Sequence, residues 1–246
     1  MISYYLTDTG RIRSHNEDSV NIVKNKEGEV LMAVADGMGG HRAGEVASLL
    51  AINDICDKFK KEFYKFDKLT AIDWLRKNID LINADIFSYV EKHPESKGMG
   101  TTIVGSIITK KYILMFNIGD SSGFVIKKDK LYKVTHDHTL VNLLLEAGQI
   151  TEEEVKNHPK KNVLMKALGA NNPVEVDIFD CDMDIKGILL CSDGLTNMLD
   201  NDQILYVLKE DVPIQDKVIK LIAKANNRGG TDNISVAYLE FNEGDL

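Results

Sequence analysis

A run of apolar residues that leads to a carboxylate constrains this chain more than any other feature of its sequence. Residues 30–35 are all apolar and show no helical periodicity, which is typical of a strand buried on both faces. We predict that this strand ends at Asp36, where Gly37 and two further glycines follow. An acidic side chain in this position caps a turn, takes a shifted pKa or binds a cation. For an isolated Asp-Gly pair, a hairpin turn is the usual explanation.

The same arrangement recurs along the chain. Apolar runs that begin at 187 and 112 lead to Asp193 and Asp120, each beside a glycine. Asp232 lies in a glycine-rich turn directly before the apolar run at 234–239. Together with the first strand, this makes four carboxylates at strand ends beside glycines, which is too many for turns alone. We therefore predict that these carboxylates converge as hard oxygen ligands of bound cations.

Size and composition exclude several other classes of protein. The 246 residues can bury a sizeable core, and no repeat or linker interrupts them, so we predict one domain over residues 1–246. The formal net charge of -8 argues against a nucleic acid or an anionic membrane as partner. The three cysteines are far apart, which fits a reducing compartment better than disulfides or a zinc site. No apolar run approaches ~18 residues, so we expect a cytoplasmic protein without a membrane span.

Hydrophobic periodicity predicts helices that are separated from runs of strands. Apolar residues recur at helical spacing over 43–59, 69–90, 204–208 and 214–225. The predicted strands cover 2–7, 19–24, 29–35, 102–109, 112–118, 123–126, 131–134, 174–179, 188–192 and 234–239. Several strands are joined by short connections, which favour antiparallel neighbours. This grouping indicates an α+β layered domain rather than an alternating parallel fold.

Residues 135–170 interrupt the strand pattern and are locally basic, with two short helices predicted around Gly148. We interpret this segment either as a mobile polar flap at the edge of a site or as a plain surface excursion. Its His136-Asp137-His138 triplet looks like a set of metal ligands. Because adjacent side chains diverge on a strand or turn, we do not assign a metal to it.

The carboxylates at the strand ends favour one class of chemistry. Carboxylate oxygens with backbone carbonyls and water select Mg²⁺, Mn²⁺ or Ca²⁺ over zinc or copper. Two such ions about 3.5–4 Å apart can activate a bridging water and clamp a phosphoryl group. Asp36 is the candidate for the bridging ligand, and the Gly37 carbonyl, Asp193 and Asp232 would complete the pair. The predicted reaction is metal-assisted hydrolysis of a phosphoester without a Ser or Cys nucleophile.

The polar stretch at 9–19 supplies further candidates. Arg13 offers a planar fork for a phosphate or a carboxylate, and Glu17 and Asp18 can add oxygens beside Asp36. Most such stretches are solvated loops, so this one decides nothing by itself. The chain contains no Walker-type Gly-x-x-x-x-Gly-Lys-Ser/Thr loop, which argues against nucleotide hydrolysis by that route.

Short motifs follow one another over most of the chain, and their order is far more specific than any one of them. They are Arg13-x-x-Asn16-Glu17-Asp18, Asp36-Gly37-Met38-Gly39-Gly40-His41, Gly44-Glu45-Val46-Ala47, Gly100-Thr101-Thr102, Gly119-Asp120-Ser121, Ser192-Asp193-Gly194 and Gly230-Thr231-Asp232-Asn233. In this order they resemble the bacterial metal-dependent protein serine/threonine phosphatases of the type 2C class.

This resemblance implies an α+β fold, a four-layer α/β/β/α sandwich in which two antiparallel β-sheets are flanked by helix pairs. A binuclear Mn²⁺ or Mg²⁺ centre would lie at one end of the sandwich. In the family pattern Asp36 bridges the two tight ions, and the Gly37 carbonyl, Asp193 and Asp232 are further ligands. Arg13 would hold the phosphate of the substrate.

The resemblance also implies a third, weaker ion. Asp120, together with Asp193, matches the pair that binds this ion in bacterial relatives. Glu17 and Asp18 would support the other side of the centre, directly or through water. The variable flap of the family, thought to affect substrate choice, falls within residues 135–170.

Two positions depart from the family pattern. Met38 stands where animal relatives carry the His that is proposed as general acid. His41 or a metal-bound water could deliver the proton instead, and His41 could equally serve only to orient the glycine loop. Near the flap, Lys166 stands where relatives usually have Arg, which keeps the charge but loses the planar fork.

The function that the resemblance implies is hydrolysis of phosphoserine and phosphothreonine on proteins, opposing a bacterial serine/threonine kinase. The partners would be phosphorylated proteins, including such a kinase, and we expect a monomer. Two alternatives remain open. One is a phosphatase dedicated to a single regulatory partner, such as an anti-anti-sigma factor. The other is a metal-binding phosphoprotein interaction module without turnover, although the complete ligand set argues against it.

Overall fold

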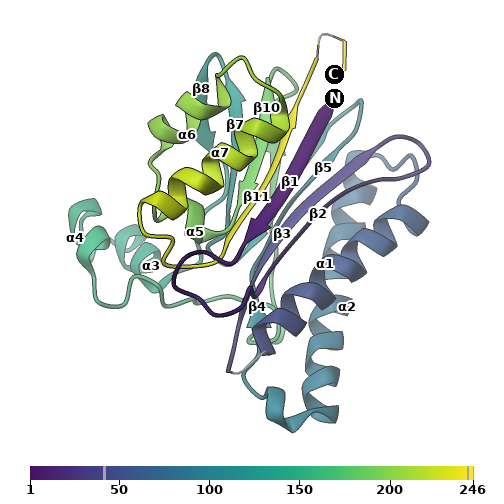
Figure 1. The fold of residues 1–246 in the computed structure, drawn as a ribbon. Helices are drawn as coiled ribbons and strands as arrows, with labels where there is room; N and C mark the ends of the chain where they lie inside the picture. The colour runs from purple at the N-terminus through teal and green to yellow at the C-terminus, as the bar shows by residue number, and fades with distance from the viewer. Residues whose placement is uncertain (41–42, 243, 246) are drawn as a thin grey trace.

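Two antiparallel β-sheets stack face to face, and helices cover both outer faces (Figure 1). This computed structural model describes residues 1–40, 43–242 and 244–245. One sheet has five strands, in the order β1 (Ile2–Asp8), β11 (Ile234–Glu240), β10 (Gly187–Cys191), β7 (Ser122–Lys127) and β8 (Lys130–Lys133). The other has six, in the order β2 (Asp18–Lys24), β3 (Val30–Met38), β5 (Ile103–Ile108), β6 (Ile113–Ile118) and β9 (Asp177–Cys181), with β4 (Gly100–Thr101) beside the end of β3.

The helices fall into two covering layers and one excursion. Helices α1 (Ala43–Glu62) and α2 (Lys68–Lys92) pack on the six-stranded sheet, and η1 (Pro94–Ser96) follows them. The five-stranded sheet is covered by α5 (Asp193–Thr196), α6 (Asn201–Leu208) and α7 (Ile214–Asn227). Between β8 and β9 the chain forms α3 (Leu140–Glu146) and α4 (Glu152–Asn157), which project away from the sandwich in Figure 1. The predicted four-layer α+β sandwich is confirmed.

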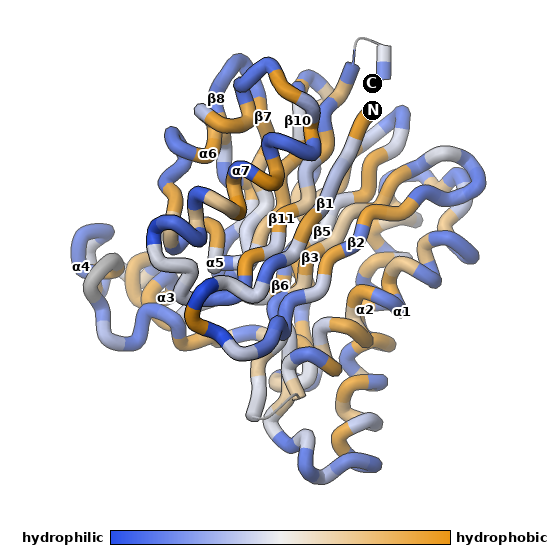
Figure 2. The backbone as a smooth tube through the Cα atoms, viewed as in Figure 1, coloured by the Kyte–Doolittle hydropathy of each residue, from blue (hydrophilic) through white to orange (hydrophobic). Residues whose placement is uncertain are grey.

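The core is divided into three apolar layers, as expected when both faces of each sheet are covered. In β3, Leu31 and Ala33 face α1 and α2, whereas Val30 and Met32 face the other sheet. This alternation explains why the sequence of β3 is apolar throughout. Each fully buried aliphatic side chain of this kind contributes about 1.5–3 kcal/mol. Figure 2 shows the apolar strands enclosed between helices whose outer surfaces are polar.

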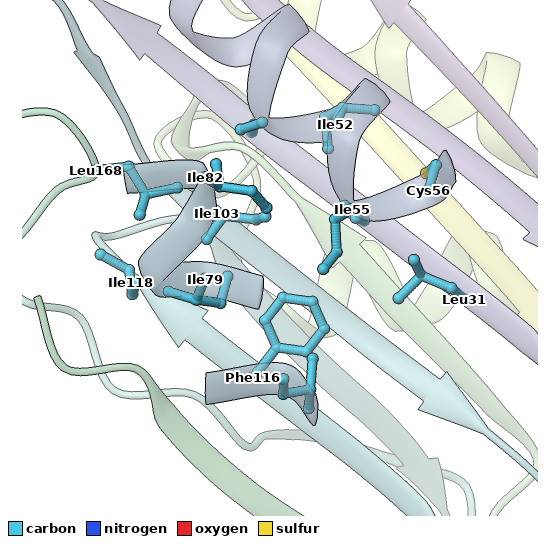
Figure 3. Close-up of a cluster of buried hydrophobic side chains, with 14 of the residues drawn as sticks. Leu31, Ile52, Ile55, Cys56, Ile79, Ile82, Ile103, Phe116, Ile118 and Leu168 are labelled. Atoms are coloured by element: carbon cyan, nitrogen blue, oxygen red, sulfur yellow. The ribbon is translucent and has the colours of Figure 1, made fainter. Parts of the chain in front are cut away.

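The layer between the helices and the six-stranded sheet is the largest of the three clusters (Figure 3). Ile55 of α1 and Ile79 of α2 meet Phe116 of β6 in it, and all three are completely buried. Helix α2 begins after Asp67, whose side chain accepts a hydrogen bond from the Thr70 N–H and so caps the helix. These contacts fix α1 and α2 on the six-stranded sheet.

Most strands lie within a residue of their predicted bounds at each end, and two depart further. The strand at 30–35 does not end at Asp36, because Asp36 pairs with Asp18 of β2 and the following residues pair with β4, so β3 continues to Met38. The strand predicted from 174 begins only at Asp177, opposite Asn117 near the end of β6, because no partner strand extends further. In the part of the chain that the structure describes, no helix combines the length and apolarity needed to cross a bilayer.

Candidate metal centre and active site

A polar cavity of roughly 400 Å³ lies at the end of the sandwich opposite the chain termini. It is formed where several strands end and where the return of the 135–170 flap crosses them. The predicted site residues that line this cavity are Arg13, Glu17, Asp36, Gly37, Asp120, Asp193 and Asp232. The fold therefore brings together acidic side chains that are distant in the sequence.

The backbone of Asp36 is held on both sides, which leaves its carboxylate facing the cavity. Its N–H donates to the Thr102 hydroxyl at 2.9 Å, and its carbonyl accepts from the Thr102 N–H and the Thr101 hydroxyl, each at 2.9 Å. The Thr102 hydroxyl also shares a hydrogen bond of 2.7 Å with Ser121, next to Asp120. Thr102 thus connects the positions of two candidate ligands. Thr102 belongs to one of the sequence motifs, but its hydrogen bonds to Asp36 and Ser121 could not be predicted from residue spacing.

Gly37 is required by close packing. A Cβ atom there would lie 2.1 Å from the Gly44 carbonyl oxygen in α1 and 2.6 Å from that of Glu17. The close approach of β3 to the start of α1 therefore excludes every other residue at this position. The Gly37 N–H also donates to the Glu17 carbonyl at 3.1 Å. Close packing therefore accounts for the glycine at position 37.

Asp18 lies behind the cavity rather than in its lining. It pairs directly opposite Asp36 across β2 and β3. Its Oδ2 accepts a hydrogen bond from the Ser192 hydroxyl at 2.7 Å, and that hydroxyl in turn accepts from the Ser235 N–H at 2.9 Å. Its Oδ1 is buried and lacks a hydrogen-bond partner among the described residues. A buried acceptor of this kind is suited to support a cation or a bound water.

Asp193 and Asp232 approach the cavity from the five-stranded sheet. Asp193 is the first residue of α5, and its Oδ2 accepts from Asn197 at 3.0 Å while its buried Oδ1 has no partner within the described residues. Asp232 lies in the turn before β11, where its Oδ2 accepts from Arg13 at 2.9 Å. The Arg13 side chain is 52% exposed, so its guanidinium lies at the rim of the cavity.

Asn233 fastens the loop that carries Arg13 and Glu17. Its Oδ1 accepts from the Glu17 N–H at 2.8 Å, and its amide nitrogen donates to the carbonyls of Thr9 and His15 at 2.9 and 3.0 Å. One buried side chain therefore satisfies three backbone groups of a loop that is distant in the sequence. The analysis of the sequence assigned no role to Asn233, because a long-range loop anchor leaves no periodic signal.

Burial and mutual repulsion dominate the electrostatics of the site. Burial first, and then the neighbouring carboxylates, raise the pKa of Asp18 and of Asp120 to about 7 and that of Asp193 to about 6. The pKa of Asp36 rises well above its usual value for the same reasons, with Asp18 as its main charged neighbour. Two like charges about 4 Å apart repel by about 4 kcal/mol at an effective dielectric constant of 20. The carboxylates can therefore lie this close together only when protons or cations offset their negative charge.

The donor set fits divalent Mn²⁺ or Mg²⁺. Carboxylates and a backbone carbonyl are the ligands these ions prefer, and two buried carboxylate oxygens, on Asp18 and Asp193, are left without partners in the described structure. Among the described residues, no three Asp, Glu, His or Cys side chains already stand in a closed ligand geometry. Arg13 and Asn197 each donate a hydrogen bond to a carboxylate oxygen of the candidate ligand set.

The remaining predicted positions have different outcomes. His41 lies outside the described residues, and Met38 lines the cavity. Lys166 is not in the lining, because its ammonium lies 3.4 Å from Asp177. The histidines of the 136–138 triplet diverge as expected, since His136 packs against Phe179 while His138 bonds with the 119–120 turn and with Asp177.

Comparisons with known proteins agree with this geometry. The protein phosphatase 2C family matches residues 11–231 of the chain. The serine/threonine phosphatase stp of Listeria monocytogenes is 42% identical over 241 residues, which cover 98% of this chain and 96% of that protein. The protein phosphatase PhpP of Streptococcus pneumoniae is 36% identical over 242 residues, covering 98% and 97%.

Solved structures show the same fold. A serine/threonine phosphatase from S. agalactiae superposes with a TM-score of 0.92 at 40% identity and covers 98% of this chain and 99% of its own. Stp1 from Staphylococcus aureus gives a TM-score of 0.92 at 35% identity, with coverages of 98% and 94%. The chain therefore belongs to the protein phosphatase 2C family of metal-dependent serine/threonine phosphatases.

Proposed function

We propose that the chain hydrolyses phosphoserine and phosphothreonine on proteins with two tightly bound ions, Mn²⁺ or Mg²⁺, held by Asp36, the Gly37 carbonyl, Asp193 and Asp232. The observation that carries this proposal is the convergence of these groups on one cavity. Asp36 is the shared ligand in this proposal, because burial first, and then the charges of Asp18, Asp193, Asp120 and Asp232, raise its pKa. It therefore lies at the centre of the cluster.

Arg13 is the proposed binding group for the substrate phosphate. When bound, a pair of such ions supplies an activated water and neutralises charge on the phosphoryl group. The Arg13 guanidinium offers two parallel donors at the rim, a geometry that matches a phosphate. Its present partner is Asp232, so an incoming phosphate competes with that carboxylate for the guanidinium. Because the Arg13 side chain is half exposed, a phosphate can approach it from solvent.

A third, weaker ion is proposed between Asp120 and Asp193. Burial and then the charge of Asp193 are the main causes that raise the pKa of Asp120, so the two carboxylates are electrostatic neighbours. Glu17 lines the cavity and Asp18 lies behind Asp36, which supports a role for both beside the tight ions. Protonation of the leaving alcohol is assigned to His41 as a proposal from the sequence. The thioether of Met38 carries no proton to give.

The proposed substrates are phosphorylated proteins, and the biological role is to oppose a serine/threonine kinase. Relatives that carry the name serine/threonine phosphatase support this. We further propose that residues 1–246 form one catalytic domain, because the two sheets share a continuous apolar layer. A monomer in the cytoplasm is proposed from the sequence.

An activity screen with different metals tests the proposal. Phosphothreonine peptides are incubated with Mn²⁺, Mg²⁺ or Ca²⁺, with EDTA as control, and released phosphate is measured. We expect turnover with Mn²⁺ or Mg²⁺, and loss of more than about 100-fold in Asp193→Asn at an unchanged circular dichroism spectrum. Turnover that persists in EDTA would contradict the proposal. Phosphopeptide binding without turnover would instead identify an interaction module, and activity on one member of a phosphoprotein panel would identify a dedicated enzyme.

A further inference from the structure

His138 lies outside the lining of the cavity, yet it holds both backbone polar groups of Gly119. Its Nδ1 accepts a hydrogen bond from the Gly119 N–H at 3.0 Å, and its own N–H donates to the Gly119 carbonyl at 2.9 Å. Gly119 directly precedes Asp120, which lines the cavity. The imidazole is only 10% exposed, so these bonds are shielded from water.

The hydrogen bonds of His138 determine its tautomer. A backbone N–H can only donate, so Nδ1 must be the unprotonated nitrogen and the ring hydrogen must be on Nε2. Nε2 lies 3.0 Å from Asp177 Oδ2 in β9, which accepts that hydrogen. The carboxylate of Asp177 thereby holds the ring so that Nδ1 points at Gly119. This is the arrangement of an orienting carboxylate behind a histidine, here directed at the backbone.

The turn at Gly119 needs such a support. Gly119 has φ +105°, and a Cβ there would lie 2.5 Å from the Thr102 side chain, so the turn is pressed against Thr102. Thr102 in turn bonds with the N–H of Asp36. The turn is therefore held between Thr102 on one side and His138 on the other. A change of the His138 ring is transmitted to Asp120 because the turn has little room on its other side.

We propose that His138 is a positioning residue that sets the place of the Gly119–Asp120 turn, and with it the direction of the Asp120 carboxylate into the cavity. The consequence for ion binding rests on the proposed role of Asp120 in holding the weaker ion. Loss of an outer partner of a metal ligand typically reduces metal affinity 10–100-fold. His138 also accepts at its carbonyl from the Met165 N–H at 2.8 Å, so the same residue connects the turn to the flap.

Two variants of His138 separate positioning from simple packing. His138→Asn keeps an acceptor near the position of Nδ1 but lacks the group that reaches Asp177. His138→Gln is closer to histidine in size but places its amide near Nε2, so the Gly119 N–H is left without an acceptor. We expect Gln to weaken the weakest Mn²⁺ site 10–100-fold and Asn to stay within about threefold of the native protein, measured by titration of free Mn²⁺. A packing role predicts the opposite order, and that result would overturn the proposal.

A double-mutant cycle with Asp120→Asn tests whether His138 affects Mn²⁺ affinity through Asp120. If His138 acts through Asp120, His138→Gln should add no further loss of Mn²⁺ affinity in the Asp120→Asn background. A full additional loss would overturn the proposal. His136→Gln is the matched control, because the His136 ring packs on Phe179 rather than on the turn, and its Mn²⁺ affinities should be native.

Amide hydrogen exchange distinguishes failure of the two proposals. In the metal-free protein, the Gly119 N–H should exchange about 10-fold faster in His138→Gln than in the native protein, and at nearly the native rate in His138→Asn. If Asp120→Asn changes no Mn²⁺ site, the proposed third ion is wrong, while this exchange pattern still supports positioning of the turn by His138. Equal exchange rates in the native protein and His138→Gln would overturn the role of His138.

Discussion

The two sides of the cavity are built in opposite ways. On the carboxylate side, Asp36 is paired with β2, and its backbone forms three hydrogen bonds of 2.9 Å to Thr101 and Thr102. On the flap side, the short helix α3 leaves Leu143 52% exposed. Carboxylates that repel one another must be held by a rigid frame, whereas an exposed wall has no such requirement. From this comparison we expect the carboxylate side to carry the chemistry and the exposed flap to tolerate change.

The flap nevertheless has a fixed base. Leu168 is completely buried and forms an antiparallel bridge with Thr101, through hydrogen bonds of 3.0 and 2.9 Å. The amide of Asn83 in α2 holds the same segment, donating to the Asn171 carbonyl and accepting from the Gly169 N–H, each at 2.8 Å. Within the described part of the flap, the excursion that carries α3 and α4 shows no such anchor to the two sheets. The boundary between rigid and exposed regions therefore lies near residue 164, within the flap itself.

The largest effect is expected from the carboxylate side. Asp36→Asn keeps the shape of the side chain but removes the charge that a pair of cations requires. We expect kcat to fall by more than about 100-fold, beyond the 10–100-fold that is typical of an outer partner of a metal ligand. Steady-state kinetics with Mn²⁺ and a phosphothreonine peptide would measure the loss. Retained activity at an intact fold would remove Asp36 from the centre.

The carboxylate side should also make the free energy of unfolding depend on pH. The pKa of Asp18 and Asp120 is raised to about 7 in the folded protein, against about 3.9 for an ordinary Asp. Between these two pKa values the folded state binds more protons than the unfolded state. The contribution of these two groups to the free energy of unfolding is therefore fully present below pH about 4 and is lost as the pH rises towards 7. A rise of one in a pKa corresponds to about 1.4 kcal/mol.

Urea unfolding at several pH values, with EDTA or with Mn²⁺, measures this dependence. The metal-free protein should weaken steadily between pH about 4 and 7. Mn²⁺ should restore most of the loss near pH 7, because it replaces the protons and binds only the folded state. A metal-free stability that rises over this interval would show that the carboxylates are ionised without penalty in the fold.

Removal of the Thr102 hydroxyl, on the carboxylate side, should lower both stability and activity. Thr102→Val keeps the volume but leaves the buried Asp36 N–H without its acceptor. An unpaired buried donor costs about 1–3 kcal/mol, and we expect kcat to fall on the order of 10-fold because Asp36 is displaced. Thermal unfolding and kinetics on the same preparation would show whether the two losses occur together. A stable but inactive variant would point to a direct catalytic role of the hydroxyl instead.

Arg13→Ala is expected to act on substrate binding. The guanidinium lies at the rim, so its loss should raise KM for phosphopeptides about 10-fold while kcat changes less, since one charged hydrogen-bond pair contributes about 1.5–3 kcal/mol. Arg13→Lys should restore only part of this, because an ammonium lacks the planar fork. An unchanged KM would disqualify Arg13 as the phosphate group's partner.

The smallest effect is expected in the exposed excursion. Thr151 and Glu154 form a capping box at the start of α4. Thr151→Ala removes that cap, which is typically worth about 1 kcal/mol, and should increase local hydrogen exchange in α4. The turnover of p-nitrophenyl phosphate should stay within about twofold of the native value. A large loss of turnover would contradict this expectation and show that the excursion contributes to the chemistry.

The residues that line the candidate site could be predicted because they follow patterns of neighbouring residues, such as an apolar run that leads to an acidic residue. Apolar runs led to Asp193 and Asp120 just beyond the ends of β10 and β6, and to Asp36 near the end of β3. The α+β sandwich followed from helical and strand-like periodicity together with the family motifs. Strand ends were less predictable, because β3 continues through Asp36 only where β2 and β4 supply partners.

The candidate ligands can be chosen from side-chain chemistry alone, since the type of side chain decides which cation a group of oxygens prefers. The groups that hold these candidate ligands in place are seen only in the folded chain. Asn233 reaches back to the loop before Glu17, and His138 reaches the turn before Asp120, over contacts that no local pattern encodes. The need for glycine at position 37 likewise arises from the approach of Gly44 in space. Such contacts depend on where distant segments pack, and packing is a property of the whole fold.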